Sequence, residues 1–291
     1  MAYTLHPEIE LGELQLKVSN LERSLRFYQD VVGFQIKSVQ QGRAELSADG
    51  RRTLLILVEV PDAVIVPRRS MSGLYHFAIL LPTRRDLGIA LRRLVDSGIH
   101  IGQADHLVSE ALYITDPDQN GIEIYRDRPR ENWERDADGH YKMTSDPIDW
   151  DGLLQEAKDG SSEGLPSGTL IGHVHFHVGD LRKAKAFYCD LLGFDVAADQ
   201  IRQMGALFIS AGGYHHHIGL NIWAGANAPA VPANGTGVAY YTIVVPDQGE
   251  LDTITDRLMK ADLDVRERDG AWFVTDPSGI EIRLKVKERD I

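Results

Sequence analysis

The sequence predicts an α+β protein made of four βαβββ modules in two halves. The first observation is a repeat: residues 21–34 read LERSLRFYQDVVGF, and residues 181–194 read LRKAKAFYCDLLGF, 160 positions later. The second is that DPDQNGIEI at Asp116 and DPSGIEI at Asp276 keep the same offset of 160. The third is that period-two strands and helical stripes surround both repeats in the same order. A constant offset between separate motifs indicates an internally duplicated chain.

The repeated segment near the start of each half is predicted to be a helix. Asn20 and Asp180 are the expected N-caps, because each precedes a run of apolar residues at helical spacing. Glycine adopts the left-handed conformation that ends helices at low cost, so Gly33 and Gly193 mark the expected C-terminal ends.

Alternating polar and apolar residues predict the strands, and two longer helices follow the later strands. The strands expected in the first half are residues 13–18, 35–39, 43–47, 53–59, 74–81, 111–115 and 122–125, with a helix at 84–98. The corresponding segments identified in the second half are strands at 173–178, 238–245, 271–275 and 280–284, with a helix at 251–261. Three further strands are expected after the first helix of this half, and residues 215–217 are expected to open the last of them.

The chain is expected to divide into two domains joined by a linker. The domains are predicted at residues 9–126 and 168–286, each with two modules, and the linker at 127–167 is charged and rich in Gly, Ser and Pro. One amphipathic piece of the linker, residues 150–157, is expected to form a short helix.

Composition excludes several classes of function. The net charge is −12 with no long basic run, so we expect no nucleic-acid partner. The longest apolar runs are too short to cross a bilayer, and no secretory signal is visible, so a cytoplasmic protein is expected. The single cysteine, Cys189, has no internal partner for a disulfide and is expected to pack inside a helix.

The two repeated phrases, with SEALYITDPDQNGIEIY at residues 109–125, resemble the vicinal-oxygen-chelate superfamily of glyoxalases and extradiol dioxygenases. Within it the chain looks like the two-domain bacterial catechol 2,3-dioxygenases of the Bacillus type. The resemblance implies that pairs of modules form two barrel-like half-shells, and that a divalent metal binds inside one of them. It covers nearly the whole chain except the linker.

The resemblance also implies where the metal ligands lie. The family's first-strand position holds Glu13, His76, His173 and Tyr240 in the four modules. The last-strand position holds Glu123 in module two and Arg283 in module four, and falls near Leu57 and Gly219 in modules one and three. His76, Glu123 and His173 therefore match a facial triad of two histidines and one carboxylate, which suits non-haem Fe(II), with Mn(II) as a second possibility.

This ligand set has a consequence for the architecture. His76 and Glu123 belong to module two and His173 to module three, so one metal requires these modules to pair across the linker. The common extradiol arrangement instead pairs modules one with two and three with four. We favour the cross-pairing as a hypothesis because it alone collects all three ligands.

Further residues are candidates for acid–base chemistry and substrate binding. Tyr113 lies ten residues before Glu123, as an active-site tyrosine does in extradiol enzymes, although a cross-strand packing role is an equal alternative. His106 matches the family's loop histidine only loosely, being nearer the tyrosine. Lining or substrate-binding roles are expected for His175 and His215.

The run from His215 to His217 matches a histidine phrase of ring-cleaving relatives, and the match makes His216 the acid–base residue. The alternation of side chains along a strand gives a different result, because it would put His215 and His217 on one face and His216 on the other. A surface loop with chance histidines is the remaining alternative.

The function expected from these features is extradiol cleavage of catechol or a substituted catechol with O2. The partners are then a small aromatic diol and O2, with no nucleic acid or membrane and with a homo-oligomer possible. One alternative is a glyoxalase-like isomerase or lyase, which usually needs a second carboxylate that the position near Gly219 does not offer. The other is a metal-free binding protein of the same fold.

Overall fold

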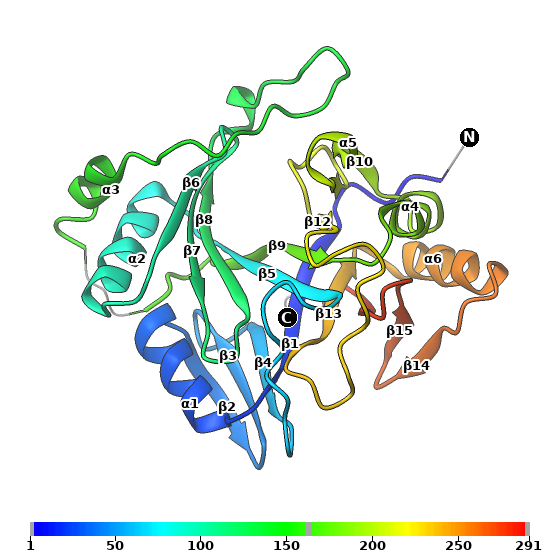
Figure 1. Ribbon diagram of the computed structural model, residues 1–291, viewed down its shortest axis with the longest axis horizontal. Helices are drawn as coiled ribbons and strands as arrows, with labels where there is room; N and C mark the ends of the chain where they lie inside the picture. The colour runs from blue at the N-terminus through cyan, green and yellow to red at the C-terminus, as the bar shows by residue number, and fades with distance from the viewer. Residues whose placement is uncertain (1–2, 161–163, 289–291) are drawn as a thin grey trace.

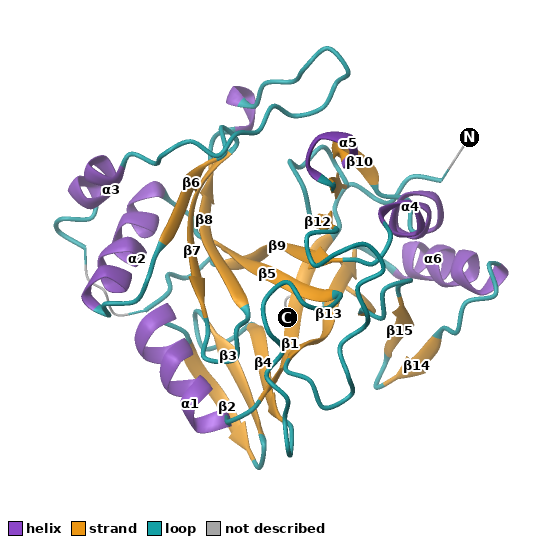
Figure 2. Cartoon of the chain, in the orientation of Figure 1, coloured by secondary structure: helices purple, strands orange, loops and turns teal. Residues whose placement is uncertain are grey.

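Two eight-stranded mixed sheets form the frame of the protein, and helices lie on their outer sides (Figures 1 and 2). The computed structural model describes residues 3–160 and 164–288. The curled sheets with helices on one side confirm the predicted α+β fold of two half-shells.

Each sheet combines strands from both halves of the chain. One sheet has the order β14-β15-β16-β13-β1-β4-β3-β2, and the other has the order β10-β11-β12-β9-β5-β8-β7-β6. The first contains β1 (Glu10–Val18), β2 (Gln35–Gln40), β3 (Arg43–Ser47), β4 (Thr53–Glu59), β13 (Gly237–Val245), β14 (Arg266–Arg268), β15 (Ala271–Thr275) and β16 (Glu281–Val286). The second contains β5 (Gly73–Leu80), β6 (Gly102–Asp105), β7 (Ser109–Thr115), β8 (Gly121–Asp127), β9 (Leu170–His177), β10 (Asp195–Gln200), β11 (Ala206–Ser210) and β12 (Ile218–Asn221).

The joins between the halves are two antiparallel strand pairs, β1 with β13 and β5 with β9. Module two therefore pairs with module three, and module one with module four, which is the cross-pairing that the ligand positions required. In Figure 1 these four strands lie in the middle of the molecule, between the helices of the two halves. The division into two domains along the sequence stays a prediction, because both sheets cross it.

The first helix of each half forms where the caps predicted it. The Asn20 side chain accepts a hydrogen bond from the Arg23 amide, and the Asp180 side chain accepts from two amides of its first turn. Each α-helix then widens into a π-helical turn, and Gly33 follows the first of these turns at φ 96°. The segments are α1 (Leu21–Arg26) with η1 (Phe27–Val32) and α4 (Leu181–Lys185) with η3 (Ala186–Leu191).

The remaining helices are α2 (Arg84–Asp96), α3 (Trp150–Glu156), α5 (Ile201–Met204), α6 (Gln248–Lys260) and the 3-10 turn η2 (Arg130–Asn132). A capping box at Thr83 and Asp86 begins α2. The linker helix α3 was predicted, and its buried Leu153 packs against α2 beside Gly88. A side chain at Gly88 would collide with the Leu153 carbonyl oxygen, 2.2 Å from the position of its Cβ.

A buried tyrosine explains why the two repeated phrases occur together. The Tyr28 hydroxyl, in η1, donates to Asp116 Oδ2 at 2.8 Å, and Tyr188, in η3, donates to Asp276 Oδ2 at 3.1 Å. Each contact joins the helix of one module to the turn before the last strand of the next. The sequence repeat with an offset of 160 residues therefore reflects one structural contact that occurs twice.

Outside the linker, three elements were not predicted. Residues 103–106 were expected to be a loop, but Gly102–Asp105 is β6 and pairs with β7. The short β14 and the single-turn α5 were also missed. All three are short, and β14 is wholly exposed, so no hydrophobic period marks them in the sequence.

Two expectations from composition can be compared with the structure. Burial raises the pKa of the Cys189 thiol to about 12, so this side chain is a packing residue and not a nucleophile. In the described ranges, no helix combines the length and apolar character needed to cross a membrane.

We expect the buried tyrosines to contribute unequally to stability. Asn120 also donates to Asp116 Oδ2, whereas Tyr188 is the one side chain that donates to Asp276 Oδ2 among the described residues. Tyr188→Phe should therefore lower the free energy of unfolding by about 2 kcal/mol, and Tyr28→Phe by less, in urea denaturation. Tyr240→Phe is the matched control. Equal losses for Tyr28→Phe and Tyr188→Phe would contradict this account.

Candidate metal centre

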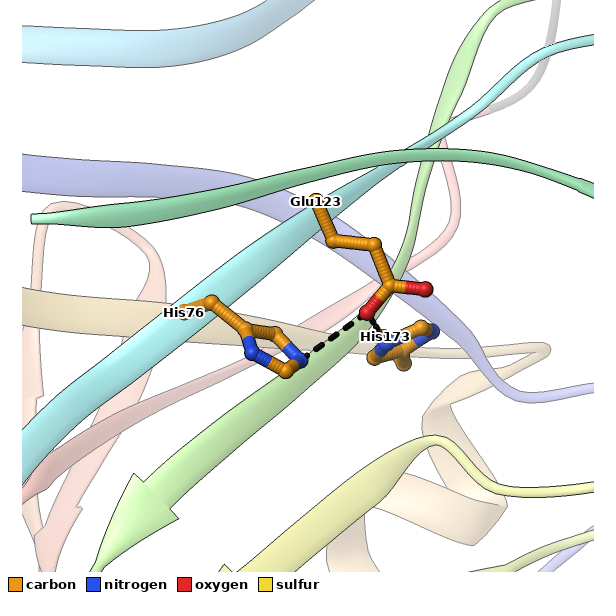
Figure 3. A group of neighbouring side chains, drawn as sticks. All are labelled: His76, Glu123 and His173. Carbon is orange, nitrogen blue, oxygen red and sulfur yellow. Dashed lines mark hydrogen bonds and ion pairs between the residues drawn. The ribbon is translucent and has the colours of Figure 1, made fainter. Parts of the chain in front are cut away.

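Three adjacent strands of the second sheet carry the predicted ligands on one face (Figure 3). In the strand register, Ala78 of β5 lies opposite Glu123 of β8 on one side and His173 of β9 on the other. His76 precedes Ala78 by two residues and therefore points to the same face. The small side chain of Ala78 leaves the space in which the other three side chains meet.

The three side chains converge on one carboxylate oxygen. Glu123 Oε2 is 3.1 Å from His76 Nε2 and 3.0 Å from His173 Nε2, and the candidate ligand atoms all lie within 4.8 Å of one another. All three residues are buried. Of the described residues, this is the group of histidine, cysteine and acidic side chains close enough to bind one ion.

The positions of these side chains suit coordination of a metal ion better than hydrogen bonding among themselves. His76 Nε2 is buried and has no hydrogen-bond partner within the described part of the chain. Ligand atoms on neighbouring corners around a metal, with bonds of about 2.1 Å, lie about 3 Å apart. The distances from Glu123 to the two imidazoles match this separation.

The protonation states of Glu123 and His76 at neutral pH favour cation binding at this site. Burial works to raise the pKa of Glu123, but the charge and hydrogen bond of His173, together with His76, hold that pKa well below its usual range. Burial also lowers the pKa of His76, against the opposing effect of Glu123. At neutral pH Glu123 is therefore ionised and His76 neutral, which are the forms that bind metals.

The corresponding place in the first sheet contains an ion pair. Arg283 Nη1 bonds to Glu13 Oε1, and Lys285 Nζ is 3.4 Å from Glu13 Oε2, beside Tyr240. The remaining position of module one was expected near Leu57. Leu57 itself is buried in the core, and its neighbour Ile56 lines the cavity that contains this ion pair, because parallel pairing sets Ile56 beside Gln15.

Gly219 leaves no room for a fourth ligand in module three. It lies on β12 opposite His175, and a Cβ there would be 2.8 Å from the His175 ring. The His175 ring therefore occupies the space that a fourth ligand would need. Its Nε2 is 2.8 Å from Asn221 Nδ2, and its ring centre is 5.0 Å from that of His76.

Tyr113 and His106 form a hydrogen-bonded pair beside the triad. Tyr113 lies opposite Glu123 in the strand register, and its hydroxyl is 2.6 Å from His106 Nε2. His106 Nδ1 is 2.5 Å from the Thr144 carbonyl oxygen, which fixes Nδ1 as the donor and Nε2 as the acceptor from Tyr113. Burial, and then Glu123, raises the pKa of Tyr113 far above its ordinary value, so the phenol stays protonated.

The histidine run was expected to open the last strand of module three, and this prediction was wrong. Residues 215–217 precede β12, which begins at Ile218, so strand alternation does not apply. His215 and His216 contact each other through their Nδ1 atoms at 2.8 Å, and the His216 ring centre lies 4.2 Å from that of His173. His217 packs on Tyr214, and its Nδ1 accepts from the Ala211 amide.

The environment of His216 keeps it neutral. Burial lowers its pKa well below the ordinary value, and the neighbouring His173 and His215 act in the same direction. Its Nδ1 is engaged by His215, so Nε2 is the nitrogen left to accept a proton.

Sequence reasoning missed Asp127, Asn221 and Thr144. Asp127 Oδ1 is 2.9 Å from His215 Nε2, and Asn221 contacts both His175 and His177. A signal for Asp127 existed, because period-two alternation along β8 places it on the same face as Glu123. Thr144 lies in the linker, and nothing in the sequence indicated that its carbonyl oxygen would reach His106.

Known proteins resemble this chain in sequence over most of its length. A family model described as the Glyoxalase/Bleomycin resistance protein/Dioxygenase superfamily matches residues 10–124 and 170–284. A catechol-2,3-dioxygenase from Bacillus subtilis (strain 168) is 55% identical over 274 residues, which is 94% of this chain and 96% of that protein.

Solved structures of low sequence identity share the fold. Glyoxalase I from Zea mays superposes with a TM-score of 0.54 at 14% identity, covering 95% of this chain and 92% of that one. The cppA protein from Streptococcus pneumoniae TIGR4 gives 0.55 at 11% identity, covering 96% of this chain and 100% of the other.

Removing any one of the three candidate ligands should abolish metal binding. His76→Ala, Glu123→Ala and His173→Ala should each reduce the metal content of protein loaded anaerobically with Fe(II) to less than about a tenth, because two remaining ligands bind weakly. His140→Ala, which removes a histidine of the linker far from the triad in sequence, is the control. Full metal occupancy in the three variants would refute the assignment.

Proposed function

This chain belongs to the glyoxalase/bleomycin resistance protein/dioxygenase superfamily, and we propose that it is an extradiol ring-cleaving dioxygenase. Its substrates are catechol or a substituted catechol and O2. The observation that carries the proposal is the open ligand set: His76, Glu123 and His173 supply three donors, and Gly219 supplies no second carboxylate as a fourth ligand. An enzyme that combines a chelating diol with O2 needs coordination positions on the metal that the protein leaves open.

The cofactor is a divalent metal, and we propose Fe(II), with Mn(II) able to occupy the same ligands. His76, Glu123 and His173 would hold it. When bound, the metal supplies the redox chemistry with O2 and lowers the pKa of a coordinated diol. The two neutral imidazoles and one carboxylate leave a net positive charge there, which suits an anionic catechol.

The side chains around the triad can hold and move protons. His216 would accept the first catechol proton at Nε2, because its pKa is low enough to keep it neutral and Nδ1 faces His215. On substrate binding, Tyr113 would turn its hydroxyl hydrogen from His106 Nε2 to a substrate oxygen. His215, held by Asp127, would fix the orientation of His216.

The buried surroundings would exclude water from the reacting groups. His175 lies against His76 and Tyr75, and Trp133 of the linker packs on His215 with ring centres 5.1 Å apart. We propose that His175 and His215 line the substrate site rather than bind the metal. A glyoxalase-like isomerase, which would use a fourth protein ligand, is disfavoured because the His175 ring fills that space.

Ring cleavage can be observed directly. Protein loaded anaerobically with Fe(II) should, with catechol and air, consume one O2 for each catechol and give a yellow semialdehyde. A visible absorbance and an oxygen electrode measure the two quantities. Protein of the Glu123→Ala variant is the control. The absence of both colour and oxygen uptake with several catechols would refute the proposal.

His216 and Tyr113 should affect turnover without affecting metal content. His216→Gln should lower kcat by about a hundredfold or more, the usual contribution of an acid–base residue. Tyr113→Phe should lower kcat by a smaller factor, because it removes one hydrogen bond. Iron content measured on the same samples separates the two effects. Unchanged kcat in His216→Gln would exclude His216 as the base, and lost iron would make it a ligand.

A further inference from the structure

A cavity of about 300 Å³ opens beside the metal centre. It touches His76, one of the candidate ligands, and Tyr113. Tyr75, Ile99, Ile114 and Ile122 supply apolar surface around it. A volume of this order accepts a single aromatic ring with a short substituent. The cavity therefore has the size and lining expected beside a site for a small aromatic molecule.

The lining of this cavity carries one permanent charge, that of Arg68. Arg68 lines it together with His100, and none of its lining residues is an aspartate or a glutamate. The whole chain has 43 acidic residues against 31 lysines and arginines, so a lining free of acids departs from the average surface. Catechol itself is uncharged at neutral pH and needs no guanidinium, whereas a carboxylate substituent does.

Arg68 is positioned for such a substituent. Its Nη1 donates to Thr115 Oγ1 at 3.0 Å, and no carboxylate forms an ion pair with it among the residues that the structure describes. Thr115 and Tyr113 are two positions apart on β7, so their side chains share a face and lie about 7 Å from each other. A ring beside Tyr113 could therefore direct a short chain toward Arg68.

We infer that this cavity receives the ring substituent of the substrate, and that Arg68 selects diols carrying a carboxylate on a short chain. The inference rests on the proposed ring-cleaving function and names the substrate class of that same site. The guanidinium has further N–H groups besides the one that Thr115 accepts, and these would donate to the carboxylate oxygens.

The test compares two diols that differ in charge and little in shape. 3,4-Dihydroxyphenylacetate carries the carboxylate, and 4-ethylcatechol is its neutral counterpart. The Fe(II)-loaded protein should have a higher kcat/KM for the acid, and Arg68→Ala should lower that value about tenfold. Arg68→Ala should change kcat/KM for 4-ethylcatechol less than twofold. Anaerobic titration calorimetry should show a Kd for the acid that is higher by about the same factor in Arg68→Ala.

Two further variants distinguish a direct contact between Arg68 and the substrate carboxylate from a general effect of positive charge. Arg68→Lys should retain part of the preference, because lysine keeps the charge but not the paired N–H groups. Arg69→Ala removes the adjacent cation, which does not line this cavity, and should change kcat/KM for the acid less than twofold. An equal loss in Arg68→Ala and Arg69→Ala would overturn the inference in favour of long-range attraction.

The outcomes distinguish this inference from the proposed function. Turnover of both diols with no preference for the acid, or with a preference that Arg68→Ala leaves unchanged, overturns the inference and leaves ring cleavage in place. No turnover of either diol by the wild-type protein removes the proposed function and the inference together. Retained 4-ethylcatechol turnover in Arg68→Ala shows that the variant is folded.

Discussion

The antiparallel pairing of β5 with β9 is the interaction on which the rest of the structure depends. It sets His173 beside Ala78, while the parallel pairing of β5 with β8 sets Glu123 on the other side of the same residue. Strand β5 comes from the first half of the chain and β9 from the second, so the ligand set is assembled only when the halves combine. The register of the sheet therefore sets the positions of the three candidate ligands. A slip of one residue would turn His173 away from Glu123.

The duplication supplies the scaffold twice and the candidate metal ligands once. In both halves a buried tyrosine joins a helix to an aspartate turn, and in both sheets strands of the two halves pair at the middle. The equivalent surface of the first sheet instead contains the ion pair of Glu13 with Arg283. Arginine cannot act as a ligand, so replacing a carboxylate by Arg283 converts a metal position into a salt bridge.

Much of the fold and the triad could be predicted because both depend on periodic patterns and fixed offsets. Edge strands β6 and β14 could not, since four and three residues are too few to show a hydrophobic period. Alternation failed for residues 215–217, because Gly212 and Gly213 with positive φ turn the chain before β12 begins. The Thr144 contact depends on how the linker packs through Trp133 and Tyr141, which is a tertiary property without a local signal.

The central claim is that one metal binds at the seam between the halves and none binds in the other sheet. Anomalous diffraction at the iron edge, from crystals of the Fe(II)-loaded protein, tests this claim most directly. The account predicts one anomalous peak per chain, in contact with His76, Glu123 and His173. A peak beside Glu13 and Tyr240, or ligands drawn from one half of the chain alone, would contradict it.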